Sequence, residues 1–149
     1  MIVVDASVAV KWFVREEGHL SALRLLEQGH VLLAPDLIFS ETANVLWKKL
    51  RKGEVTLEQP RQACTALPEF FQAVISAARI APVAIEIANR LNHPVYDCIY
   101  LACAEDQGAR LVTADKKFVS RINDAGMGQL AIGLDDVDKS SDMTIPDKE

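Results

Sequence analysis

Short apolar runs alternate with helical segments along this chain of 149 residues, and that alternation limits the possible folds more than any other feature. Each run lacks the alternating polar residues of a half-exposed strand, so each fits a strand that is buried on both faces. The predicted strands are Ile2–Val4, Val31–Ala34, Arg110–Thr113 and Leu130–Leu134. Buried strands separated by helices predict an α/β fold with a mainly parallel central sheet.

Glycine, proline and capping residues set the limits of the helices between these strands. The predicted helices cover residues 7–14, 19–28, 37–52, 56–68, 83–91, 95–106 and 118–123. Pro82 is expected to open the helix that ends at Leu91. Residues 69–80 show no clear period and fit either a continued helix or a strand near Ile80.

Length and composition predict one domain over residues 1–134 and a polar acidic tail at 135–149. The tail contains six acids and two lysines without periodicity, so we expect it to be mobile. No stretch approaches the roughly 20 apolar residues that span a bilayer. The first apolar run is interrupted at Asp5 and has no basic start, unlike a secretory signal. We therefore expect a cytoplasmic protein without membrane contact.

The cysteines and histidines show no spacing that is typical of a zinc site. The three cysteines predict reduced thiols in the core, and the three histidines are expected at the surface or in turns. They are Cys64, Cys98, Cys103, His19, His30 and His93.

Four acidic residues lie at the ends of otherwise apolar elements. Asp5 and Asp115 each end a predicted strand, Glu41 lies near the start of the helix after the second strand, and Asp97 opens an apolar helix. A carboxylate at the edge of a buried element is costly unless its charge is compensated. Since functional groups gather beyond the carboxyl ends of parallel strands, we expect all four to meet there and hold a divalent cation.

Carboxylate oxygens without histidine or thiolate partners favour Mg²⁺, with Mn²⁺ as a substitute. Such a cation can activate water and neutralise phosphate, which suits phosphodiester hydrolysis. Three neighbouring polar residues fit this picture. The hydroxyls of Ser7 and Thr113 can orient a carboxylate or a water molecule, and Asn44 lies one helical turn after Glu41 on the same face. Each also fits a plain structural role, as a helix cap, a strand residue and a surface residue respectively.

The distribution of charge permits a nucleic-acid partner although the net charge is −5. The tail carries −4 of this, and the fourteen bases and fifteen acids of residues 1–134 carry −1. The basic groups at 48–52 and 116–117 fit either solvated helix faces or phosphate contacts. Lys48 shares a helix face with Glu41 and Asn44. Three aromatic residues fit either base stacking or the core: Trp12, Phe13 and Trp47.

The segments that carry the four acids resemble those of VapC-like PIN-domain toxins, and they occur in the same order. The segments are Met1–Trp12, Pro35–Leu46, Tyr96–Ala102 and Leu111–Phe118. The resemblance implies a PIN-like three-layer α/β/α sandwich and a metal-dependent endoribonuclease that is the toxin of a type II toxin–antitoxin pair. It also implies an RNA substrate, a small VapB-like antitoxin as partner, and a homodimer.

Mapped onto this chain, the resemblance makes Asp5, Glu41, Asp97 and Asp115 the catalytic and metal-binding residues. Asp5 and Asp97 are the expected principal ligands, with Asp115 beside them, and Glu41 completes the site or orients the attacking water. The acidic tail is the main departure from the family pattern.

Two other classes remain open on the residues alone. A catalytically silent RNA-binding or scaffold module is the first, although such a module has no physical need for four charges at buried edges. A phosphoacceptor receiver domain is the second, but it normally has adjacent acids after its first strand and a lysine after its last. Here Ala6 and Ser7 follow Asp5, and the segment from Gly128 to Leu134 has no lysine. A dinucleotide-binding enzyme is disfavoured because no G-x-G-x-x-G follows any strand.

Overall fold

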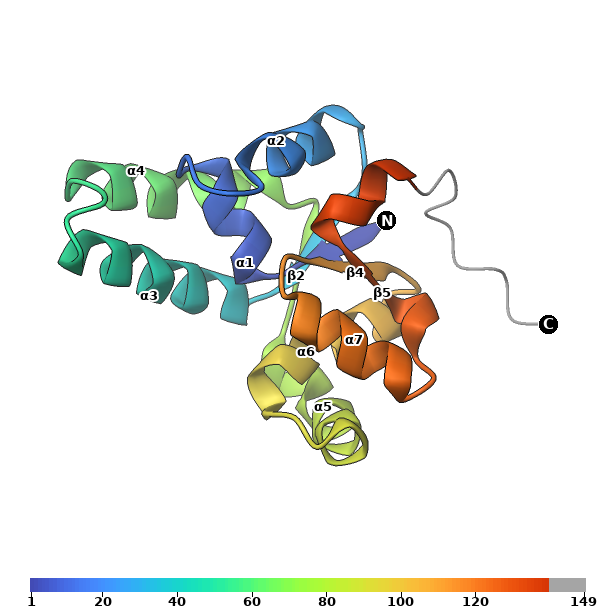
Figure 1. The fold of residues 1–149 in the computed structure, drawn as a ribbon. Helices are drawn as coiled ribbons and strands as arrows, with labels where there is room; N and C mark the ends of the chain where they lie inside the picture. Colours follow the sequence, from blue (N-terminus) through green and yellow to red (C-terminus); the bar gives the residue numbers. More distant parts are fainter. Residues whose placement is uncertain (140–149) are drawn as a thin grey trace.

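A five-stranded parallel sheet forms the centre of the computed structural model, which describes residues 1–139 (Figure 1). The strand order is β3-β2-β1-β4-β5, and every neighbouring pair is parallel. The strands are β1 (Ile2–Val4), β2 (Leu32–Pro35), β3 (Ala73–Ile75), β4 (Arg110–Thr113) and β5 (Ala131–Gly133). The predicted α/β class and the parallel sheet are confirmed.

Helices cover both faces of this sheet, as buried parallel strands require. In Figure 1, α1 and α2 lie on one side, α5, α6 and α7 lie on the other, and α3 and α4 extend from the sheet as a pair. The helices are α1 (Ala6–Ala9), α2 (His19–Glu27), α3 (Leu37–Arg51), α4 (Glu58–Ala66), α5 (Ala77–Leu91), α6 (Val95–Asp106) and α7 (Lys116–Asp124). Short 3₁₀ helices are η1 (Val10–Trp12), η2 (Leu67–Phe70), η3 (Gly128–Leu130) and η4 (Leu134–Lys139).

The register of the central strands positions the residues that follow them. Val4 of β1 pairs with Val112 of β4, so the next residues along the two strands, Asp5 and Thr113, emerge side by side. Both strands are fully buried along this stretch. The carboxyl edge of the sheet therefore places the end of β1 against the end of β4.

The segment between α4 and α5 differs from the prediction. It contains η2 and the edge strand β3, and α5 starts at Ala77, so Pro82 lies inside the helix instead of opening it. A proline inside a helix removes a hydrogen bond and disfavours helical structure before it. Packing outweighs that cost, because the buried stripe Ile80, Ala84, Ile87 and Leu91 continues across the proline.

The predicted domain boundary at residue 134 falls at the start of η4. Leu134 and Val137 are buried in the core, since residues three apart share one face of a 3₁₀ helix. Asp138 of η4 forms an ion pair with Arg24 of α2. The first part of the predicted tail is thus packed on the domain, and its remainder, residues 140–149, lies outside the described residues.

Two of the three cysteines match the prediction of buried, reduced thiols. Cys98 and Cys103 are free and buried in α6, and burial raises the pKa of their thiols to about 11 and about 12. Cys64 is free but exposed on α4, so its predicted core position is wrong. Within residues 1–139, no helix combines the length and apolar character needed to cross a bilayer.

Candidate active site

One cavity of about 440 Å³ brings together all four predicted acids. They reach it from the end of β1 (Asp5), from α3 (Glu41), from the first turn of α6 (Asp97) and from the residue before α7 (Asp115). Burial raises the pKa of both Asp5 and Glu41, and the negative charge of Asp97 adds to the rise in each case. Asp115 lies at the rim and also lines a neighbouring cavity.

Asp5 is the most constrained of the four. Its Oδ1 accepts hydrogen bonds from the Ser7 hydroxyl at 2.5 Å and from the Val8 amide at 3.2 Å, so it caps α1. Its Oδ2 accepts a hydrogen bond from the Thr113 hydroxyl. Each carboxylate oxygen has two lone pairs, so these donors leave one free on Oδ2. The carboxylate is therefore held in one orientation with a single acceptor site available.

The same two hydroxyls also connect β1 to the loop after β4. Ser7 Oγ accepts from the Ala114 amide at 3.0 Å, and Thr113 Oγ1 accepts from the Asp115 amide at 3.1 Å. Thr113 is fully buried. Both hydroxyls orient Asp5, and Thr113 additionally fixes the backbone that carries Asp115.

Burial makes ionised Asp5 unfavourable. Desolvation raises its pKa to about 6, although the hydrogen bonds from Ser7, Thr113 and Val8 act in the opposite direction. A buried carboxylate of this kind is stabilised by a nearby positive charge. Burial likewise raises the pKa of Glu41.

Glu41 and Asp97 each have a partner that the sequence analysis did not identify. The Tyr100 hydroxyl donates to Glu41 Oε2 at 2.8 Å, and Tyr100 is itself buried in α6. His93 Nε2 lies 2.7 Å from Asp97 Oδ2, and the imidazole stacks on Phe118 with ring centroids 4.6 Å apart. Spacing gave a signal for His93, which lies four residues before Asp97, but none for Tyr100, which lies 59 residues from Glu41.

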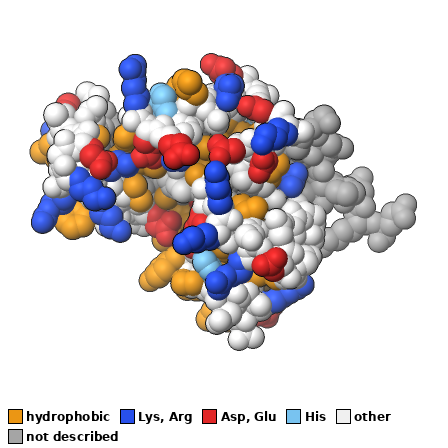
Figure 2. All heavy atoms as spheres, viewed as in Figure 1, with side chains coloured by type: hydrophobic (Ala, Val, Ile, Leu, Met, Phe, Trp, Pro, Cys, Tyr) orange, Lys and Arg blue, Asp and Glu red, His pale blue; other side chains and the backbone are white. Residues whose placement is uncertain are grey.

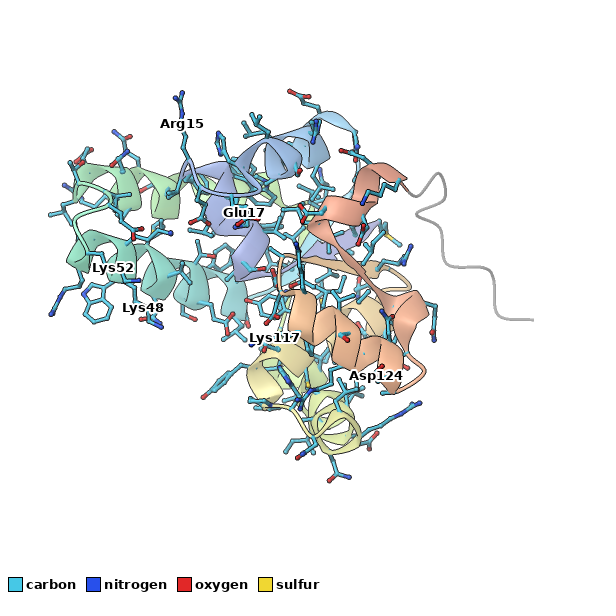
Figure 3. All side chains as sticks on the ribbon, in the orientation of Figure 1. Arg15, Glu17, Lys48, Lys52, Lys117 and Asp124 are labelled. Carbon is cyan, nitrogen blue, oxygen red and sulfur yellow. The ribbon has the colours of Figure 1, made fainter. Side chains whose placement is uncertain are left out.

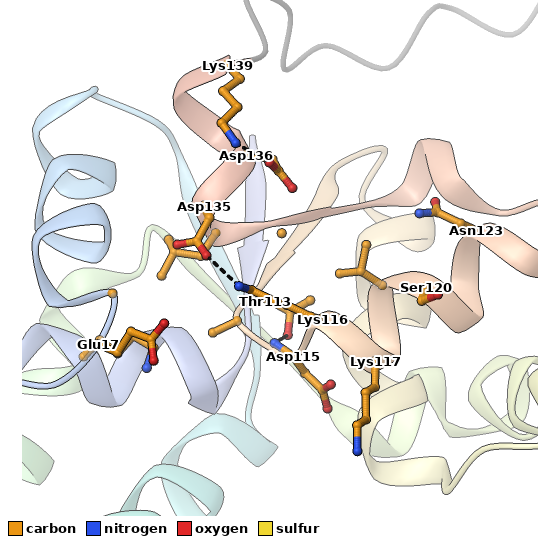
Figure 4. Close-up of a pocket in the computed structure, with 16 residues that line it drawn as sticks. Glu17, Thr113, Asp115, Lys116, Lys117, Ser120, Asn123, Asp135, Asp136 and Lys139 are labelled. Atoms are coloured by element: carbon orange, nitrogen blue, oxygen red, sulfur yellow. Dashed lines mark hydrogen bonds and ion pairs between the residues drawn. The ribbon is translucent and has the colours of Figure 1, made fainter.

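Asp115 caps α7 by accepting a hydrogen bond from the Phe118 amide at 3.0 Å. Like Lys11, it lines both the acidic cavity and a larger one of about 850 Å³, which Figure 4 shows in close-up. In that cavity Lys116 forms an ion pair with Asp135 at 3.3 Å, and Asp136 pairs with Lys139. Acidic groups of η4 thus neutralise Lys116 next to the candidate site.

The cations in the acidic cavity are Lys11 and Lys49, and both bind Glu16. Lys11 lies 3.0 Å from one Glu16 oxygen, and Lys49 contacts the other. No sequence signal marked Glu16, because its partners lie in two different helices. Lys49 and Asn44 line the cavity, whereas Lys48 is exposed on α3 outside it, so a contact between Lys48 and substrate phosphate stays a prediction. Trp12 is a core residue, stacked on Phe70.

The Glu16 network has a predicted effect on stability. Burial on its own raises the pKa of Glu16, but the hydrogen bonds and charges of Lys49 and Lys11 outweigh it and hold the pKa below its usual value. Stability from such a group is present above its unfolded-state pKa and is lost as the pH falls through the folded-state pKa. Glu16→Gln should therefore lower the free energy of unfolding by about 1 kcal/mol at pH 7, and this difference should vanish in acid.

Urea unfolding of both proteins at neutral and at acidic pH measures this difference. The control is Glu17→Gln, since the exposed Glu17 carboxylate forms no ion pair within residues 1–139 (Figure 3). That variant should stay within about 0.5 kcal/mol of the native protein. An equal loss in both variants would contradict the assignment of the network.

The donor chemistry of the cavity fits a hard divalent cation. It offers carboxylate oxygens, and its two ammonium groups are bound by Glu16. No three His, Cys, Asp or Glu side chains of residues 1–139 are already arranged as a metal cage. Magnesium does not need one, because it retains several waters and commonly uses one or two carboxylates together with substrate phosphate.

Comparison with known proteins agrees with this architecture. Residues 2–123 match the PIN domain family. The chain belongs to that family. Ribonuclease VapC3 of Pyrobaculum aerophilum is 35% identical over 122 residues, which cover 80% of this chain and 93% of the relative. Ribonuclease VapC1 of Mycobacterium tuberculosis is 29% identical over 120 residues, which cover 79% of this chain and 88% of the relative.

A solved structure of similar shape confirms the PIN fold. The crystal structure of PAE2754 from Pyrobaculum aerophilum aligns with a TM-score of 0.66 at 22% sequence identity, over 90% of this chain and 89% of that one. At this identity the likeness concerns the fold alone. This PIN domain therefore has the predicted α/β sandwich, and its relatives include proteins that are named VapC ribonucleases.

Proposed function

We propose that this protein is a metal-dependent endoribonuclease and the toxin of a type II toxin–antitoxin pair. The observation that carries the proposal is the convergence of Asp5, Glu41, Asp97 and Asp115 on one cavity. With Glu16 they make five carboxylates against two lysines, a net three negative charges when all are ionised. The relationship to VapC ribonucleases supports RNA as the substrate.

Each side chain has a distinct part in this proposal. Asp5, Asp97 and Asp115 hold the cation, and Mg²⁺ is the expected ion, with Mn²⁺ as a substitute. Glu41, fixed by Tyr100, completes the site or orients a water molecule toward the phosphate. When bound, a divalent cation neutralises phosphate charge and makes water more acidic. Ser7, Thr113 and His93 orient the carboxylates.

The partners follow from the same proposal. A small VapB-like antitoxin would block the acidic cavity, and two copies of the chain would form a homodimer. The cytoplasm remains the predicted location. Copurification of the chain with the product of the adjacent gene, followed by measurement of the mass of the complex, tests both interactions.

Removal of metal should abolish the activity. Purified protein incubated with total RNA should cleave it in Mg²⁺, lose cleavage in EDTA, and recover it when excess Mg²⁺ or Mn²⁺ is added. Sequencing of the new RNA ends identifies the substrate and the cut site. Persistent cleavage of the same bonds in EDTA by protein stripped of metal would refute metal dependence, and absence of cleavage under every condition would refute the nuclease assignment.

A further inference from the structure

Few basic side chains in the described part of the chain lack an interaction partner. Within residues 1–139, the lysines and arginines that form neither a hydrogen bond nor an ion pair nor a cation–π contact are Arg15, Lys48, Lys52 and Lys117. Figure 3 shows Lys48 and Lys52 on the outer part of α3 and Lys117 at the start of α7, with Arg15 on a different side of the molecule. The three unpaired lysines therefore flank the acidic cavity from two sides.

The exposed face of α3 leads from the cavity to Lys48 and ends next to Lys52, the residue that follows the helix. Asn44, Trp47, Lys48 and Arg51 follow one another at intervals of three and four residues, so they form one stripe along the helix. The stripe begins at the cavity, which Asn44 and Glu41 line. At 1.5 Å per residue it extends roughly 15 Å from Glu41 to Arg51. Beyond Glu41 it contains no carboxylate.

Trp47 is the one large aromatic side chain on this stripe. The residue is 52% exposed, and the Arg51 guanidinium lies 5.6 Å from the centre of its ring. An exposed tryptophan next to an arginine and unpaired lysines is the arrangement on which nucleic-acid bases stack. Figure 2 shows the same grouping of charge, with acidic side chains in a central hollow and basic side chains gathered on the α3 arm and beside the hollow.

We propose that the RNA substrate crosses the cavity from Lys52 and Lys48 on α3 to Lys117 on α7, with an unpaired base stacked on Trp47. This inference rests on the proposed ribonuclease function. The net negative cavity repels phosphate, so cations on both sides are needed to hold a polyanion across it. Because a base must leave its duplex to reach Trp47, the RNA bound there is single-stranded.

Binding measurements separate the phosphate contacts. The probe is a fluorescein-labelled single-stranded RNA of mixed sequence and about 20 nucleotides, and the protein carries Asp97→Asn so that the RNA stays intact. Fluorescence anisotropy in Mg²⁺ between about 50 and 200 mM salt gives the salt dependence of affinity. Lys48→Ala, Lys52→Ala and Lys117→Ala should each reduce the slope of log K against log salt by about 0.7. Arg15→Ala should leave the slope unchanged.

The stacking contact has its own test. Trp47→Ala should weaken binding of the single strand about tenfold, and Trp47→Phe should retain most of the affinity. Double-stranded RNA, made by annealing the same strand to its complement, offers no unpaired base to Trp47. Its affinity should therefore be the same with and without the Trp47→Ala substitution. Leu20→Ala, which removes an even more exposed apolar side chain from α2 (69% exposed), should have no effect on either RNA.

The outcomes distinguish this inference from the function on which it rests. Native affinity and native cleavage in the Lys48, Lys52, Lys117 and Trp47 variants would overturn the path and leave the nuclease proposal standing. Failure of the native protein to cleave any RNA would refute the nuclease proposal itself. Unchanged RNA affinity combined with lost antitoxin binding, or with a changed oligomeric state, would show that the α3 stripe is a protein interface and would also overturn the path.

Discussion

Replacing Asp97 with asparagine should reduce RNA cleavage at least about a hundredfold while the protein stays folded. Asparagine has nearly the same shape but no negative charge, so it binds a divalent cation poorly. The Asp97 side chain is 43% exposed, and asparagine retains a side-chain oxygen beside His93, so the fold should tolerate the change. Initial rates in Mg²⁺ measure the activity, and circular dichroism with thermal unfolding measures the fold.

Asp124→Asn is the matched control for this experiment. Asp124 lies at the far end of α7 and forms no ion pair within residues 1–139 (Figure 3), so its substitution should leave cleavage unchanged. Asp5→Asn should be as inactive as Asp97→Asn, because it alters the carboxylate that Ser7 and Thr113 hold in place. Full activity in a folded Asp97→Asn protein would remove the basis for the metal site.

Thr113→Val should lower the free energy of unfolding by about 2–4 kcal/mol. Valine has the shape of threonine, so the effect isolates the hydroxyl. Its loss leaves the buried Asp5 carboxylate without one donor and the Asp115 amide without its acceptor. Both groups lie where water does not replace the lost partner easily, since Thr113 is 0% exposed and Asp5 is 9% exposed. Urea unfolding of native and variant protein measures the difference.

Thr42→Val is the contrasting substitution. Thr42 is also 0% exposed, but its hydroxyl has no hydrogen-bond partner among the described residues. Replacing an unpartnered buried hydroxyl with a methyl group should leave stability unchanged or raise it by about 1 kcal/mol. Thr113→Ser, which retains the hydroxyl, should recover most of the stability lost in Thr113→Val. Equal losses in the two valine variants would show that the Asp5 network contributes nothing specific.

Much of the fold follows from local patterns in the chain. The central strands are unbroken apolar runs, and burial on both faces leaves such runs few alternatives to a parallel sheet. The edge strand β3 was not predictable in the same way, because Val74 is 43% exposed and the strand has only three residues. Its pairing with β2 supplies the hydrogen bonds that its composition does not indicate. The start of α5 escaped prediction because tertiary packing holds Pro82 inside a helix.

The four acids could be identified before their positions were known, because charge at the end of a buried element is unusual in itself. Most of the side chains that bind or orient these acids could not be identified in this way. Glu16 binds lysines from two helices, and Tyr100 reaches a carboxylate 59 residues away in the chain. The choice of Lys49 over Lys48 as a cavity residue depends on the rotation of α3 about its axis, which packing sets.

The sequence by itself determined the parallel α/β class and singled out the four acids that line one cavity, since both depend on which side chains are apolar or charged and on their spacing. Only the tertiary structure decided which groups orient those carboxylates, which cations are already neutralised and which remain free. Those properties depend on contacts between segments far apart in the chain, and such contacts form only when the sheet and its helices have packed together.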